Sequence, residues 1–208
     1  LQARVTAAIA RDLERQENHR EAVTWWQRHL GVQPDSAHRK DLAVAQIAIG
    51  DVDGAVLSYR AWFRRHTTDI EVALWLGKND LGEGLFSEAR EYFEAVLELR
   101  PNNLEALHGL AQSAAGEGND DEALRLFGRI LALEKDHIPA ALALAEQAIE
   151  QGEDIRAVEL LKRVLSQNPQ HPEARQLAIE ALRRQAQRSR GVKAERLWGD
   201  RKSTRLNS

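Results

Sequence analysis

The chain has 208 residues, of which 43% are hydrophobic and 29% charged, and its formal net charge is −3 at pH 7. This composition predicts a folded, soluble protein with an ample core and excludes a disordered chain. The lack of cysteine excludes disulfides and thiolate metal sites, and no apolar run approaches the roughly 20 residues of a membrane span.

The chain begins at Leu1 and contains no methionine. We therefore expect an internal fragment, from which an upstream signal or anchor could be missing, and the compartment stays open between cytoplasm and periplasm or envelope. The last nine residues, 200–208, read DRKSTRLNS and resemble a translated sequencing adapter. We expect this segment to be an artefact of a bacterial metagenomic source and exclude it from the fold.

Five consecutive units are predicted, each made of two short amphipathic helices joined by a tight turn. They cover residues 3–36, 37–69, 70–103, 104–137 and 138–171. In the first unit we expect helices near residues 5–15 and 20–30. A further helix, residues 172–188, is predicted to cap the array with a solvated face that carries Arg183, Arg184 and Arg188. Residues 189–208 are predicted to be a disordered tail.

Small residues recur in both helices of the units at a nearly constant interval. In the second helices they are Ala22, Ala55, Ala89, Ala123 and Ala157. In the first helices they are Ala10, Ala43, Gly77, Ala111 and Ala145. Large residues share the period, as Ile9, Leu42, Leu76, Leu110 and Leu144, and as Trp26, Tyr59, Phe93, Phe127 and Leu161. Small residues on facing helices let the backbones approach, so that the large side chains interlock.

The turns carry their own signals. Glycine precedes four of the second-helix alanines at a constant spacing, as Gly50, Gly84, Gly118 and Gly152, and we expect it in the left-handed conformation. Asn119 and Glu122 have the spacing of a capping box. The other second helices are expected to be capped by Asp53, Ser87 and Asp154.

A period of about 34 residues with small, large and aromatic residues at these offsets resembles the tetratricopeptide repeat (TPR) family over residues 3–171. The resemblance implies an all-α, right-handed superhelical solenoid of antiparallel helix hairpins, residues 1–188, whose first helices line a concave groove. The sequence departs from the family at a late position of the second helix, which is small in the family. His29 and Trp62 stand there, so we expect the first two units to pack differently.

No catalytic constellation is visible. The seven histidines lack the spacing of a zinc site, and the glycine pairs follow helices, which does not suit a phosphate-binding loop. Asp51 and Asp53 resemble the start of a calcium loop, but the ligand spacing that should follow is missing. We therefore predict a non-enzymatic protein with no cofactor and no metal.

The predicted groove carries a few polar groups among apolar ones, which suits an extended or helical peptide. Its candidate partner-binding residues are Arg11, Lys40, Val44, Leu74, Lys78, Leu81, His108, Gln112, Leu142 and Glu146. The leading hypothesis is therefore a scaffold or adaptor for a protein or peptide partner.

Two other functions are weighed. The chain could be the substrate-recruiting arm of a larger, truncated enzyme, such as a glycosyltransferase, or of an envelope-assembly protein. RNA binding by helical repeats is weaker, because residues 70–171 hold 9 Lys and Arg against 19 Asp and Glu. Such an acidic centre disfavours nucleic acid as a partner.

Overall fold

A computed structural model describes the backbone of residues 2–34 and 37–206 and the side chains up to residue 190. These residues form eleven helices and no strand, which confirms the all-α fold class. The chain divides into two compact units, Leu1–Glu117 and Gly118–Ser208, which are described separately. None of the described helices is long and apolar enough to span a membrane.

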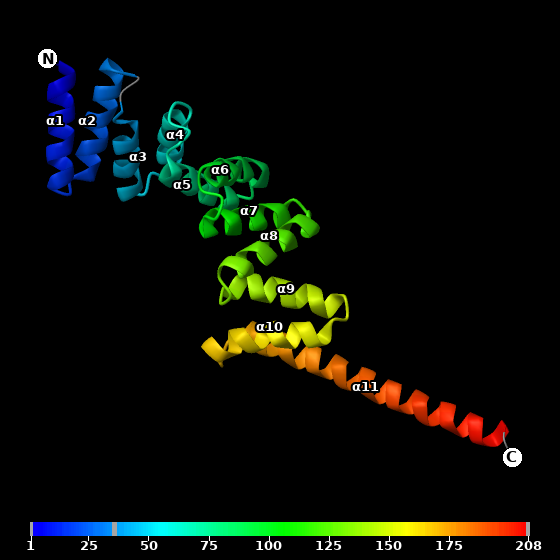
Figure 1. Ribbon diagram of the computed structural model, residues 1–208. Helices are drawn as coiled ribbons and strands as arrows, with labels where there is room; N and C mark the ends of the chain where they lie inside the picture. Colours follow the sequence, from blue (N-terminus) through cyan, green and yellow to red (C-terminus); the bar gives the residue numbers. More distant parts are fainter. Residues whose placement is uncertain (1, 35–36, 207–208) are drawn as a thin grey trace. The chain divides into compact units, whose positions relative to one another are not determined.

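The helices of both units follow one another as antiparallel hairpins (Figure 1). The first unit contains α1 (Gln2–Arg15), α2 (His19–Val32), α3 (Arg39–Ala48), α4 (Val52–Phe63), α5 (Ile70–Gly82), α6 (Phe86–Leu99) and α7 (Leu104–Gly116). The second contains α8 (Asp120–Leu133), α9 (Ile138–Glu150), α10 (Asp154–Gln167) and α11 (Pro172–Leu206). The predicted repeat of residues 104–137 thus gives its first helix to one unit and its second helix to the other.

The recurring small residues lie at the helix contacts, as their spacing predicts. All five second-helix alanines are buried, and so are the five small residues of the first-helix series. The contact with Phe93 requires glycine in particular, because a Cβ on Gly77 or Gly109 would meet the ring of Phe93. Phe93 fills the space that these two glycines leave between α5, α6 and α7, which shows why small and large residues recur together.

The turn glycines have the predicted left-handed backbone. Their φ angles lie between 74° and 79°, and Glu17, which replaces glycine in the first turn, has a φ of 58°. In each case the residue after this position is the N-cap of the next helix, whatever its type: Asn18, Asp51, Leu85, Asn119 and Glu153. The turn geometry therefore fixes where the second helix begins.

This rule corrects three of the predicted caps. Asp53, Ser87 and Asp154 are good capping types, but each lies one or two residues inside its helix. Asp51 is the residue that caps α4, where its side chain accepts from the N–H of Gly54 at 3.0 Å. The N-cap role of Asn119 is confirmed, because Asn119 Oδ1 accepts from Glu122 N at 3.4 Å. The returning bond differs from a capping box: the Glu122 carboxylate accepts from the side-chain amide of Asn119, at 2.8 Å, and not from its backbone N–H.

The bulky residues at the late second-helix position are accommodated differently. His29 is buried, and its Nδ1 lies 3.0 Å from both Thr6 Oγ1 and the carbonyl oxygen of Ala3. These contacts join α2 to α1. Trp62 is half-buried and stacks on His66, with ring centroids 3.5 Å apart. Polar and ring contacts thus stand where an aliphatic side chain packs in later repeats.

The last helix, α11, is longer than predicted. It continues past residue 188 to Leu206, because the sequence after Pro172 contains no proline that would end it. Arg184 Nη1 donates to the carbonyl oxygen of Ile149 at 2.8 Å, and Arg188 donates to that of Gly152. Two arginines of the predicted solvated face therefore bind the carboxyl end of α9 and its turn. Residues 207–208 of the adapter-like segment lie outside the described residues, and its artificial origin stays a prediction.

Candidate protein-interaction surface

Ion pairs join the successive first helices of the first unit. Lys40 of α3 donates to Asp69 at 2.9 Å and to Glu71 at 3.1 Å, both at the start of α5. Lys78 of α5 pairs in turn with Glu105 at the start of α7. Each lysine thus reaches from one first helix to the next, and two predicted partner-binding residues are held by bonds within the protein.

Asp69 is the centre of the first of these links. Besides Lys40, it accepts hydrogen bonds from Trp62 Nε1 at 3.0 Å and from the N–H of Val72 at 3.3 Å, where it caps α5. Burial alone raises the pKa of Asp69, but these three hydrogen bonds hold the pKa below its usual value. Burial lowers the pKa of Lys40, and the bonds to the two carboxylates more than offset it, so that the pKa is raised.

Arg11 lies in a different cluster, which contains His38 and, next to it, His29. Its Nη2 is 3.4 Å from Nε2 of His38, whose Nδ1 lies 2.7 Å from the Asp41 carboxylate. The His38 ring stacks on Trp26 with centroids 4.9 Å apart, and Trp26 is fully buried. Arg11 itself is exposed, so it remains accessible at the edge of this cluster.

Apolar side chains accompany the ion pairs on these helices. Val44 of α3 is 51% exposed and Ile47 is 36% exposed, while Leu74 and Leu81 of α5 are half-buried. On α7, His108 is half-buried and Gln112 is exposed. The first helices of this unit therefore present apolar groups between neutralised pairs of opposite charge.

The remaining two predicted residues belong to the second unit. Leu142 of α9 is buried in the core formed by α9, α10 and α11, whereas Glu146 is exposed. The row pattern of the first helices predicts a surface position for Leu142. In the structure its side chain instead completes the aliphatic core of its own unit.

A buried ion pair is missing from the sequence-based expectations. Asp80 of α5 is fully buried, and both of its carboxylate oxygens accept from Nη2 of Arg60 in α4 at 2.9 Å. The equivalent positions of the next two repeats carry Ala114 and Ala148. An acid at a position that is alanine in the next two repeats was the available signal, since buried acids need a partner.

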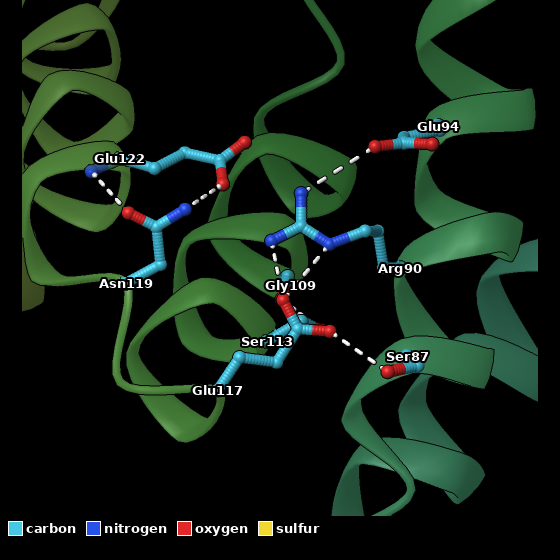
Figure 2. Close-up of polar contacts among 8 residues, drawn as sticks. All are labelled: Ser87, Arg90, Glu94, Gly109, Ser113, Glu117, Asn119 and Glu122. Carbon is cyan, nitrogen blue, oxygen red and sulfur yellow. Dashed lines mark hydrogen bonds and ion pairs between the residues drawn. The ribbon is translucent and has the colours of Figure 1, made fainter.

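A second polar network joins the start of α6 to the end of α7, away from the loop between these two helices (Figure 2). Arg90 of α6 donates to Glu117 at 2.7 Å, and Ser87 donates to the same carboxylate at 3.0 Å. Glu94 accepts a longer contact from Arg90 at 3.5 Å. The bond from Arg90 lowers the pKa of Glu117. The network ties the residue after α7 to α6 and contains none of the predicted partner-binding residues.

Within the described part of the chain, no group of three or more His, Asp or Glu side chains is arranged to hold a metal ion. The structure instead presents a surface of regularly spaced helix hairpins, whose first helices carry apolar side chains and ion-paired charged ones. These features define a helical-repeat protein of the scaffold class.

The chain belongs to the tetratricopeptide repeat family. Family models described as tetratricopeptide repeat match residues 7–69, 80–148 and 114–178. Repeats of this family generally mediate protein or peptide binding. No curated protein matches the sequence significantly.

Several solved structures share the fold. The MamA protein is 24% identical with a TM-score of 0.63, over 74% of this chain and 85% of MamA. YrrB is 19% identical with a TM-score of 0.67, over 81% and 88% of the two chains. Pseudomonas aeruginosa PilF is 18% identical with a TM-score of 0.62, over 95% and 92%. At these identities the likeness concerns the fold alone.

Proposed function

We propose that the protein is a non-catalytic scaffold that binds a partner peptide along the first helices of its first unit. We name this region the first-helix surface and define it by Val44, Ile47, Leu74, Lys78 and Leu81. The observation that carries the proposal is the exposure of Val44 and Ile47 on α3, beside lysines that are already paired. Exposed apolar groups among fixed polar ones are typical of peptide sites.

The ion pairs of this surface indicate which kind of peptide it can bind. Lys40 and Lys78 are neutralised by Asp69, Glu71 and Glu105, so the surface has no excess of positive charge to attract an acidic tail. A peptide with apolar side chains and few charges fits better, because it buries its side chains against Val44 and Ile47 without breaking the pairs. YrrB, which shares the fold, is described as having an unusual peptide-binding site, and this supports a peptide as the class of partner.

The test is a peptide selection followed by a matched pair of substitutions. Peptides are selected by phage display on the full chain, and their affinities are measured by fluorescence anisotropy. Val44→Asp should weaken the selected peptides about tenfold, the effect of losing an apolar contact of about 1.4 kcal/mol. Leu57→Asp is the matched control, because Leu57 is 71% exposed but belongs to the second helix α4.

Circular dichroism should show that both variants remain folded, since both sites are exposed. Peptides that lose affinity to Leu57→Asp and keep it with Val44→Asp would place binding on the second helices and contradict the proposal. Equal affinity for both variants would contradict it as well.

A further inference from the structure

Two histidine rings meet where the first hairpin, α1 and α2, packs on α3. His29 of α2 is 2% exposed, and its ring centroid lies 4.8 Å from that of His38, the N-cap of α3. His38 in turn stacks on Trp26 of α2, which is fully buried. The two imidazoles are therefore part of the contact between α2 and α3, which lie side by side (Figure 1).

The hydrogen-bond partners of His38 fix the place of its proton. Its Nδ1 lies 2.7 Å from an oxygen of the Asp41 carboxylate, which can only accept, so Nδ1 carries the proton and donates. Its Nε2 lies 3.4 Å from Nη2 of Arg11, which can only donate, so Nε2 is the unprotonated nitrogen and accepts. The bond from Arg11 therefore requires a neutral His38, because a proton on Nε2 would face another donor.

The partners of His29 fix its proton in the same way. Its Nδ1 lies 3.0 Å from the carbonyl oxygen of Ala3, which can only accept. Nδ1 is thus the protonated nitrogen, and a charged His29 needs a second proton on Nε2 of a buried ring. Burial lowers the pKa of His29, and this effect outweighs the bond to the Ala3 carbonyl, which raises the pKa.

The charged groups around the two rings leave little to stabilise a further cation. In the described part of the chain, Arg11 of α1 and Asp41 of α3 act on His29 with opposite sign. Thr6 of α1, whose Oγ1 lies 3.0 Å from the His29 ring, is uncharged. The Glu14 carboxylate of α1 accepts a hydrogen bond from Trp26 Nε1 at 2.8 Å. Protonation of both rings therefore places two positive charges close together beside charges that already offset each other.

We propose that the pair of His29 and His38 is a pH-sensitive junction, which releases the first hairpin from α3 as the pH falls below neutrality. A proton on His38 breaks its bond with Arg11, and a proton on His29 places a charge inside the hairpin. Opening exposes both rings to water, where they bind protons more readily, so that acid shifts the equilibrium towards the released hairpin. The junction acts on the packing of α1 and α2 and is independent of the peptide site.

Amide hydrogen exchange of the full chain measures this release. The ratio of the observed to the intrinsic exchange rate gives the opened fraction of each helix at each pH. In α1 and α2 the opened fraction should rise at least about tenfold between pH 7.5 and 5.5, the effect of one proton bound on opening by a group with a pKa of about 6.5. In α5 and α6, which contain no histidine, it should change less than about twofold.

Two variants and a matched control connect the rise to the histidine pair. His29→Asn and His38→Gln keep an amide that can hydrogen-bond but cannot be protonated in this pH range. Each should reduce the rise in α1 and α2 at least about twofold, and His29→Asn should have the larger effect because its ring is buried. His19→Gln replaces another histidine of α2, at the first residue of the helix, and should leave the rise unchanged.

The tautomers supply a second measurement, which does not require the hairpin to open. Heteronuclear NMR of the imidazole nitrogens at pH 7.5 should find the proton on Nδ1 in both His29 and His38. A proton on Nε2 of His38 would overturn the proposal, because Arg11 could not bond that nitrogen. So would an equal rise of exchange in α5 and α6, the absence of any rise in α1 and α2, or a rise that neither variant reduces.

Discussion

At one point of the repeat, α3 and α5 of the first unit carry polar side chains, whereas α7 of the same unit and α9 of the second unit carry alanine. In the first unit, Gln46 and Asp80 are buried at equivalent positions of α3 and α5, and each bonds a side chain of another element. In the second unit the equivalent residue of α9 is Ala148, which lies in an aliphatic core. The first unit therefore combines apolar packing with buried polar pairs, whereas α9 to α11 of the second rely on apolar packing at this point.

The comparison shows that the backbone of the repeat does not depend on this side chain. Left-handed turns and small contact residues are common to both units and set the helix positions. A buried acid is then tolerated only if its partner is present, because a lone buried charge is costly. Polar pairs thus restrict which helices can be neighbours, while alanine imposes no such condition.

The largest effect is expected when the partner of the buried Asp80 is removed by a substitution of Arg60. Arg60→Leu leaves the buried Asp80 carboxylate without its guanidinium, and we expect a loss of about 3 kcal/mol in the free energy of unfolding. The double variant Arg60→Leu with Asp80→Ala should recover most of this loss, since alanine occupies the equivalent positions 114 and 148.

Urea denaturation followed by tryptophan fluorescence measures this effect. Four of the five tryptophans lie in the first unit, and Trp198→Phe removes the fifth, so the signal then reports that unit. Arg163→Leu, at an exposed site of α10, is the control and should have little effect. A double variant as unstable as the single one would show that Asp80 is not the reason for the loss.

A smaller loss of stability is expected from a substitution of one of the buried small residues, which recur in both units. Ala123→Leu introduces three carbon atoms at a buried position of α8, and we expect a cost of about 2 kcal/mol from overpacking. The exposed Ala132 of the same helix supplies the control variant Ala132→Leu. A thermal melt unaffected by Ala123→Leu would contradict the register of the small residues.

Low pH should lower the free energy of unfolding of the first unit, because His29 is buried. Burial lowers the pKa of His29, so the unfolded chain holds more protons than the folded one below about pH 6.5, and stability falls as pH drops through this range. The lowered pKa of Asp69 adds a further loss below about pH 4. The urea midpoint of the first unit should fall between pH 7.5 and 5.5, and less so in His29→Gln. An identical slope in that variant would exclude His29 as the cause.

The smallest effect is expected in the second unit, at the contact between α11 and α9. Arg184→Gln removes a cation that bonds the Ile149 carbonyl at the carboxyl end of α9, and we expect a cost of about 0.5 kcal/mol. Arg183→Gln, at a neighbouring exposed position, is the control. Amide hydrogen exchange in α9 and α11 measures the difference. Equal exchange in both variants would contradict a role for Arg184 in docking α11.

Sequence reasoning predicted the helix hairpins, the left-handed turns and the buried alanines, because each follows from a local signal that repeats at a fixed interval. It misplaced the caps at Asp53, Ser87 and Asp154 by choosing residue types, whereas the preceding turn decides the position. It selected Lys40 and Lys78 as partner-binding residues without the carboxylates that bind them. Those carboxylates lie about one period away along the chain, where many charged residues are equally plausible partners.

The sequence alone determined that this chain is an array of helix hairpins, since steric period, turn chemistry and helix propensity act within a few residues and agree in every unit. The tertiary structure decided which charges are paired, which leucine is buried and which valine is exposed. Leu74 and Leu142 occupy equivalent positions of the repeat, yet only Leu142 is buried in a core. Burial depends on the neighbouring helix, and a periodic pattern does not contain that information.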